Sequence, residues 1–141
     1  MDQATALHDE EEDLPPVSTH TTCVTSSFQA RQLTRGFLAT LSPAPTPETT
    51  ETVLLVVSEL VTNALRYGNG VTDFRLSSLH DTLLVEVGDS SSALPRERAP
   101  QTFEEGEGGG FGWPIIRHLA RDITIRLRRN NGKIIYAGIP L

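Results

Sequence analysis

The spacing of apolar residues predicts two long helices in the first half of the chain. Ser26 or Ser27 can cap the first, which runs to about residue 41, where a cluster of prolines must end it. Thr46 as N-cap and Pro47 in the first turn begin the second helix, which continues to Gly68. At about 100° per residue its apolar side chains share one face: Val53, Val57, Leu60, Val61 and Ala64. The second helix therefore has one face to bury.

Four segments in the second half of the chain are predicted as strands, and in the second of them Leu83, Val85 and Val87 alternate with Leu84 and Glu86. The four segments are residues 71–79, 82–89, 122–129 and 133–141. Turns at His80-Asp81 and at residues 130–132 join them as two hairpins, and a short helix is predicted from Pro114. About three helices on one face of a mainly antiparallel four-stranded sheet would bury every apolar face. The pattern thus predicts an α+β two-layer sandwich.

The acidic residues are concentrated at the N-terminus. The chain has 141 residues and a formal net charge of −6, and residues 1–20 hold six of its 18 acidic side chains. This segment has little to bury, so we expect a disordered acidic tail, which could compete for a basic surface of a partner. Residues 21–141 suit one globular domain in length and apolar content.

Composition also narrows the partners and the compartment. The arginines are scattered and, outside the tail, balanced by acidic residues, whereas nucleic-acid binding needs a clustered basic stripe. No apolar run approaches the roughly 20 residues that span a bilayer, and the acidic start lacks the features of a secretion signal. Cys23 is the only cysteine, which excludes an intrachain disulfide and suits a reducing compartment. We therefore expect a cytoplasmic protein with no nucleic-acid or membrane partner.

A polar stripe lies on the second predicted helix, opposite its apolar face, and consists of Glu59, Asn63 and Arg66. Considered alone, a glutamate and an asparagine four positions apart form an ordinary pair on a solvated helix face. The stripe therefore gains meaning only from other features of the chain.

Two further segments carry groups suited to a ligand. Asp89 ends the strand predicted over residues 82–89, where its carboxylate can accept hydrogen bonds from an amine or begin a turn. Residues 106–114, GEGGGFGWP, lead into the helix at Pro114, and free backbone N–H groups at such a start bind anions. The glycines can also serve as a flexible linker. The connection over residues 89–112 is long for a compact domain, and loops of that length tend to be functional or mobile.

In this order along the chain, Glu59, Asn63, Asp89 and the glycines of residues 108–112 make the sequence resemble the histidine-kinase-like (GHKL) ATPase family. SELVTNAL, residues 58–65, matches the N box of that family. The sequence is most similar to the small stand-alone anti-sigma-factor serine kinases of bacteria. The resemblance covers about residues 20–141 and implies a Bergerat-type ATP-binding fold.

The resemblance implies roles for the stripe on the second helix. Glu59 would be the general base that polarises the attacking water or substrate hydroxyl. Asn63 would hold Mg²⁺ through its side-chain oxygen, which agrees with the preference of this ion for few protein oxygens together with substrate phosphates. Arg66 stands where the family often has a lysine, and it would supply a cation to the nucleotide.

The resemblance also implies which residues would bind the adenine and the phosphates of ATP. Asp89 would accept a hydrogen bond from the adenine amino group. Gly108, Gly110 and Gly112 would match the glycine box that wraps the phosphates, with residues 96–107 as a mobile lid. Phosphoryl transfer at such a site needs mostly positioning and charge neutralisation.

The implied function is that of an ATP- and Mg²⁺-binding regulator that sequesters a sigma factor and phosphorylates a serine of an antagonist protein. The alternative is a non-catalytic interaction module with a degenerate nucleotide site. Two departures from the family favour it: residues 89–93 read DSSSA in place of DxGxG, and Glu104, Glu105 and Glu107 lie beside the phosphate loop. The family commonly dimerises, which leaves a homodimer open, although no exposed apolar stripe indicates one.

Overall fold

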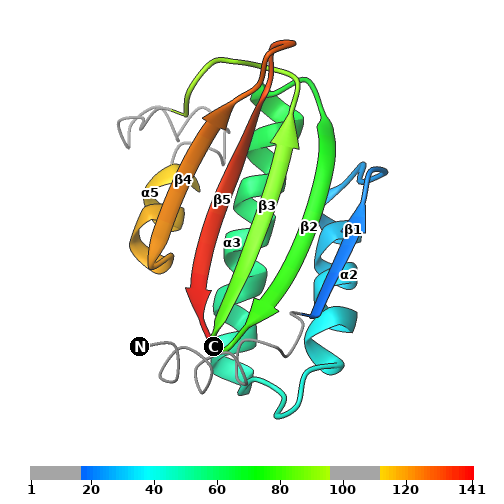
Figure 1. The fold of residues 1–141 in the computed structure, drawn as a ribbon, viewed down its shortest axis with the longest axis vertical. Coiled ribbons are helices and arrows are strands. Elements are labelled where there is room, and N and C mark those ends of the chain that lie inside the picture. The colour runs from blue at the N-terminus through cyan, green and yellow to red at the C-terminus, as the bar shows by residue number, and fades with distance from the viewer. Residues whose placement is uncertain (1–16, 96–111) are drawn as a thin grey trace, which may run out of the picture.

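The computed structural model describes residues 17–95 and 112–141, and in these ranges three helices cover one face of a five-stranded antiparallel sheet (Figure 1). The helices are α2 (Ser27–Ala39), α3 (Pro47–Tyr67) and α5 (Gly112–Leu119). The strands are β1 (Val17–Thr21), β2 (Val71–Leu79), β3 (Thr82–Asp89), β4 (Asp122–Leu127) and β5 (Lys133–Pro140). The predicted α+β two-layer architecture is confirmed.

Both long helices begin at the caps expected from the sequence. The side chain of Ser26 accepts a hydrogen bond from the backbone N–H of Gln29, and that of Thr46 accepts one from Thr49. Helix α3 ends at Gly68, whose N–H donates to the carbonyl of Ala64. None of the helices in the described ranges is long and apolar enough to cross a membrane.

The strands lie in the order β1-β2-β3-β5-β4, with every neighbouring pair antiparallel. The β2–β3 and β4–β5 pairs are the two predicted hairpins. Pairing of β3 with β5 joins the hairpins, and its register sets Asp89 opposite Lys133. The end of β3 and the start of β5 therefore lie side by side at one end of the sheet.

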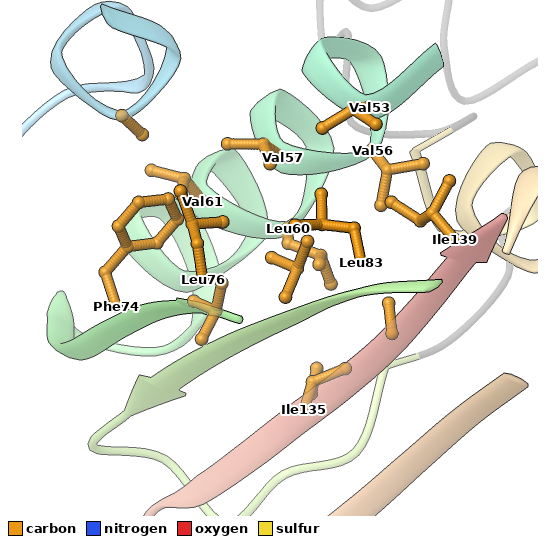
Figure 2. Close-up of a cluster of buried hydrophobic side chains, with 14 of the residues drawn as sticks. Val53, Val56, Val57, Leu60, Val61, Phe74, Leu76, Leu83, Ile135 and Ile139 are labelled. Atoms are coloured by element: carbon orange, nitrogen blue, oxygen red, sulfur yellow. The ribbon is translucent and has the colours of Figure 1, made fainter. Parts of the chain in front are cut away.

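The hydrophobic core lies between α3 and the sheet (Figure 2). All five apolar residues predicted on the inner face of α3 are buried. In Figure 2 the valines and leucine of α3 face side chains of β2, β3 and β5, among them Phe74, Leu76, Leu83, Ile135 and Ile139. Burial of each such side chain contributes about 1.5–3 kcal/mol. Because the core fixes one face of α3, the opposite polar stripe is held in a defined direction.

The sheet has five strands rather than the predicted four, because Val17–Thr21 pairs with β2 as strand β1. Four of these residues belong to the segment expected to be a disordered tail. No residue of β1 is buried, so its hydrophobic pattern carries little signal. The strand is held instead by backbone pairing and by a contact of 3.2 Å between His20 Nε2 and Asp73 Oδ1 of β2.

Candidate functional site

Three elements meet at the upper end of the sheet in Figure 1: the end of α3, the end of β3 and the turn before β5. A backbone hydrogen bond of 2.8 Å from the N–H of Ser90 to the carbonyl of Gly68 ties α3 to β3. Asp89, the last residue of β3, is only 4% exposed at this junction. The carboxylate that the sequence singled out is thus enclosed by three segments that are far apart in the chain.

Asp89 forms a buried ion pair with Lys133, the first residue of β5. The Nζ atom of Lys133 lies 2.9 Å from Oδ2 and 3.2 Å from Oδ1 of Asp89, and the lysine is 5% exposed. Oδ1 also accepts a hydrogen bond of 2.9 Å from the backbone N–H of Ser91. The ammonium group in turn donates to the carbonyl of Ser91 at 3.1 Å. Asp89 and Lys133 therefore satisfy each other inside the protein.

Two glycines leave room for this ion pair. A methyl group at Gly68 would overlap the carboxylate of Asp89, and one at Gly132 would lie 2.5 Å from the backbone oxygen of Asp89. Gly132 also has a φ of +94°, a conformation that other residues rarely adopt. The close approach of α3 and of the β4–β5 turn to Asp89 thus depends on glycine at both positions.

We predict that Gly68→Ala lowers the free energy of unfolding by about 1–3 kcal/mol, the usual cost of overpacking. The added methyl group cannot be accommodated by a simple swing of Asp89, because Lys133 and Ser91 hold its carboxylate. Urea denaturation measures the change. Gly36→Ala is the control, since nothing lies within 4 Å of a methyl group there, and it should stabilise α2 by about 0.5–1 kcal/mol. Equal stability of the Gly68→Ala variant and the wild type would contradict the tight packing.

A second cluster lies further back along α3, where α5 begins. Helix α5 packs against α3, and a methyl group at Gly112 would lie 2.5 Å from Oε1 of Glu59 and 3.6 Å from Oδ1 of Asn63. Glu59 and Asn63 are both half-buried, so they do not form a fully solvated face. From Glu59 to Gly68 the helical rise is about 13 Å. Glu59 and the surroundings of Asp89 thus lie more than two helical turns apart along α3.

The surroundings of Glu59 change its acidity. Burial raises the pKa of the Glu59 carboxyl above its ordinary value of 4.5, and the positive charge of Arg66 lowers it by a smaller amount. The folded protein therefore binds a proton at Glu59 more tightly than the unfolded chain does. The stabilisation that this gives is complete below pH 4.5 and is lost as the pH rises through the folded pKa.

From this sign we predict that Glu59→Gln makes the protein more stable at pH 7, by less than about 1 kcal/mol because the group is only half-buried. The variant should also lose part of the fall in stability between about pH 4 and pH 7. Thermal unfolding at several pH values measures both effects. Glu51→Gln, an exposed glutamate of the same helix, should change stability by less than about 0.5 kcal/mol. If Glu59→Gln were less stable than the wild type, the folded protein would instead stabilise the ionised carboxylate of Glu59.

Residues 25–139 match the model of the histidine kinase-like ATPase domain. The chain belongs to this family. A chain in the crystal structure of the SiaB–SiaC complex from Pseudomonas aeruginosa is similar over 97% of both chains, with a TM-score of 0.53 and 12% identity. At this identity the likeness concerns the fold alone. A comparison with curated proteins found no match.

The histidine kinase-like ATPase family was the resemblance inferred from the sequence, and its domain-level assignment is confirmed. The narrower likeness to anti-sigma-factor kinases stays a prediction. Gly108 and Gly110, the lid over residues 96–107 and its three glutamates lie outside the described residues. Of the predicted glycine box, Gly112 is described, and it lies close to the side chain of Glu59. The roles predicted for these residues stay predictions.

The described residues fit Mg²⁺ with its phosphates better than they fit an adenine base. At the α5 end, the amide oxygen of Asn63 beside the carboxylate of Glu59 fits Mg²⁺, which takes one or two protein oxygens and completes its shell with phosphates and water. Arg66 lies near enough to act on the charge of Glu59. At the Asp89 end, the acceptor expected to read adenine is already bound by Lys133. Glu59 and Asn63 therefore suit Mg²⁺, whereas Asp89 has its hydrogen-bonding capacity largely taken by Lys133 and Ser91.

Lys133 and Gly68 are the site residues that the sequence did not predict. Lys133 occupies the same alternation as the buried Ile135, Ala137 and Ile139, so a charged residue falls on the apolar face of a strand. A lysine on the apolar face of a strand was the sequence signal that could have identified Lys133 as a site residue.

Proposed function

We propose that this protein is an ATP- and Mg²⁺-binding regulator of the anti-sigma-factor serine kinase type. It would transfer a phosphoryl group from ATP to a serine or threonine of an antagonist protein. The observation that carries the proposal is the close approach of Gly112 to Glu59, because a methyl group added there would lie 2.5 Å from Oε1 of Glu59 and 3.6 Å from Oδ1 of Asn63. This approach supports a site in which Glu59 would be the base, Asn63 the metal ligand and Gly112 the end of the glycine box.

The chemistry follows from these residues. The side-chain oxygen of Asn63 would hold Mg²⁺, and ATP would supply the phosphoryl group. Glu59 would accept the proton of the attacking hydroxyl, and its raised pKa makes it a stronger base than an exposed glutamate. The N–H groups in the first turn of α5 lack helical partners and favour the negative charge of phosphates. Gly112 lets this turn approach Glu59 without a side chain between them.

The partners we propose are a sigma factor and its antagonist, both met in the cytoplasm. The similar fold of a chain from the SiaB–SiaC complex supports a protein partner in a general sense, because that structure is itself an assembly of two proteins. A kinase of this type needs a surface that recognises the protein carrying the serine.

The second candidate is a non-catalytic interaction module, and the Asp89–Lys133 pair favours it. A base that approaches Asp89 meets a carboxylate whose oxygens already accept hydrogen bonds from Lys133 and Ser91. Loss of the glycines after Asp89 points in the same direction. Such a protein would keep the fold and its partners without phosphorylating them.

Isothermal titration with ATP, with and without Mg²⁺, followed by transfer of labelled γ-phosphate to candidate antagonists, tests the proposal. We expect Mg²⁺-dependent binding and a labelled serine or threonine. Glu59→Gln should retain binding and lose transfer, because the base acts only in the chemical step. Binding without transfer to any tested antagonist would favour the module, and absence of binding would contradict the nucleotide role altogether.

A further inference from the structure

Lys133 is the only lysine in the chain, and the other eleven basic residues are arginines. Its side chain is 6% exposed and points to the same side of the sheet as the core residues of β5. A lysine is rarely buried to this degree unless it is paired. Its place beside Asp89 therefore requires an explanation beyond surface charge.

The ammonium group of Lys133 is fully engaged. It has three N–H donors, and three acceptors lie within 3.2 Å: both carboxylate oxygens of Asp89 and the carbonyl of Ser91. Oδ1 of Asp89 has a second partner in the N–H of Ser91. All three N–H donors of Lys133 are thus used, and together with the N–H of Ser91 they take up most of the hydrogen bonds that Asp89 can accept. No donor on Lys133 is left for another molecule in this arrangement.

We propose that the ammonium group of Lys133 occupies the base end of the nucleotide site and competes with the base for Asp89. The inference rests on the proposed nucleotide-binding function and specifies how its base end is read. A purine amino group that donates to Asp89 competes with the lysine, because Lys133 already lies within 3.2 Å of both oxygens of the same carboxylate. Lysine suits this role since its ammonium sits on a flexible four-carbon stem.

It follows that most of the affinity for ATP should come from its triphosphate and Mg²⁺ rather than from its base. Along α3, Glu59 lies about 13 Å and Asn63 about 7–8 Å of helical rise from Gly68, whereas the hydrogen bonds of Lys133 are made to Asp89 and Ser91. Triphosphate binding with Mg²⁺ should therefore be independent of Lys133. Discrimination between a nucleoside triphosphate and a bare triphosphate should be weak in the wild type, because the base gains little on entering.

The first test compares titrations of Mg-ATP and Mg-tripolyphosphate on the wild type and on Lys133→Thr. We expect Lys133→Thr to bind ATP about tenfold more tightly, the usual contribution of one hydrogen bond to a charged group, with tripolyphosphate affinity unchanged. Arg126→Thr is the charge-matched control. Arg126 lies over the ring of Tyr136, 5.5 Å from its centroid, and belongs to the opposite alternation of the sheet from Lys133, so its loss should alter neither affinity.

The second test needs no variant and covers the case in which Lys133→Thr fails to fold. Because the chain has a single lysine, labelling with ¹³C- and ¹⁵N-lysine gives one side-chain signal by nuclear magnetic resonance. We expect Mg-ATP to shift the Cε and Nζ resonances of Lys133 as the ammonium leaves Asp89. Mg-tripolyphosphate should leave them in place.

The outcomes separate this inference from the function on which it rests. Unchanged or weaker ATP binding by a folded Lys133→Thr variant, or a lysine signal that Mg-ATP does not move, would overturn the competition while leaving ATP binding intact. If neither ATP nor tripolyphosphate binds the wild type, the proposed function fails, and this inference with it. Tighter ATP binding with unchanged tripolyphosphate binding supports both.

Discussion

Replacing Lys133 with methionine should lower the free energy of unfolding by about 3–5 kcal/mol, the cost of removing one partner of a buried ion pair. The variant leaves the Asp89 carboxylate 4% exposed and without its cation, and the carbonyl of Ser91 loses a donor. Gly68 packs directly on the carboxylate, so Asp89 cannot turn toward solvent without opening the end of α3. Methionine has a similar length, which limits any effect of an empty space.

Urea denaturation measures this loss, and two controls define its origin. Arg75→Met removes the cation of a partly exposed pair, 3.7 Å from Glu86, and should cost no more than about 1 kcal/mol. Lys133→Met combined with Asp89→Asn should recover much of the loss, because no uncompensated charge remains buried. If Lys133→Met were as stable as the wild type, the pair would not be closed in solution.

Local signals explain why most of the fold could be predicted. Helix α3 begins and ends where Thr46, Pro47 and Gly68 place it, because capping depends on a few adjacent residues. The turn before β5 was visible for the same reason, since Asn131 and Gly132 suit positive φ values. Strand β1 was missed because its stability comes from pairing with β2, more than fifty residues away, and not from an apolar face of its own.

In the candidate site, too, local features could be predicted and contacts between distant residues could not. Helical spacing places Glu59 and Asn63 on one face of α3, and the match of residues 58–65 to the N box made them candidates. The partner of Asp89 could not be predicted, because Lys133 lies 44 positions away and meets it only through the register of β3 and β5. From the sequence, the carboxylate of Asp89 at the end of a strand is expected to be free to accept hydrogen bonds. The structure shows that Lys133, a residue far away in the sequence, already donates to it. Pairing across the sheet thus changes the expected chemistry of a residue whose position was predicted correctly.

The substitution Asn63→Ala should weaken Mg²⁺-dependent ATP binding by at least about 100-fold while leaving the fold intact. Loss of outer-shell partners alone typically costs 10–100-fold in metal affinity, and Asn63 would be the direct ligand. The fold should survive because Asn63 lies off the buried face of α3. Isothermal titration with ATP in Mg²⁺ and in EDTA measures the effect, and circular dichroism monitors the helices.

Two further variants make this result specific to the metal. Asn63→Asp keeps a side-chain oxygen at the same position, so it should retain Mg²⁺ dependence that alanine loses, because carboxylates also bind this ion. Gln32→Ala removes an exposed amide from α2 and should leave ATP binding unchanged. Equal ATP affinity in the wild type and Asn63→Ala would show that the ion is held elsewhere. Loss of helical signal in Asn63→Ala would instead assign the residue a structural role, since its contact with the start of α5 would then be needed for packing.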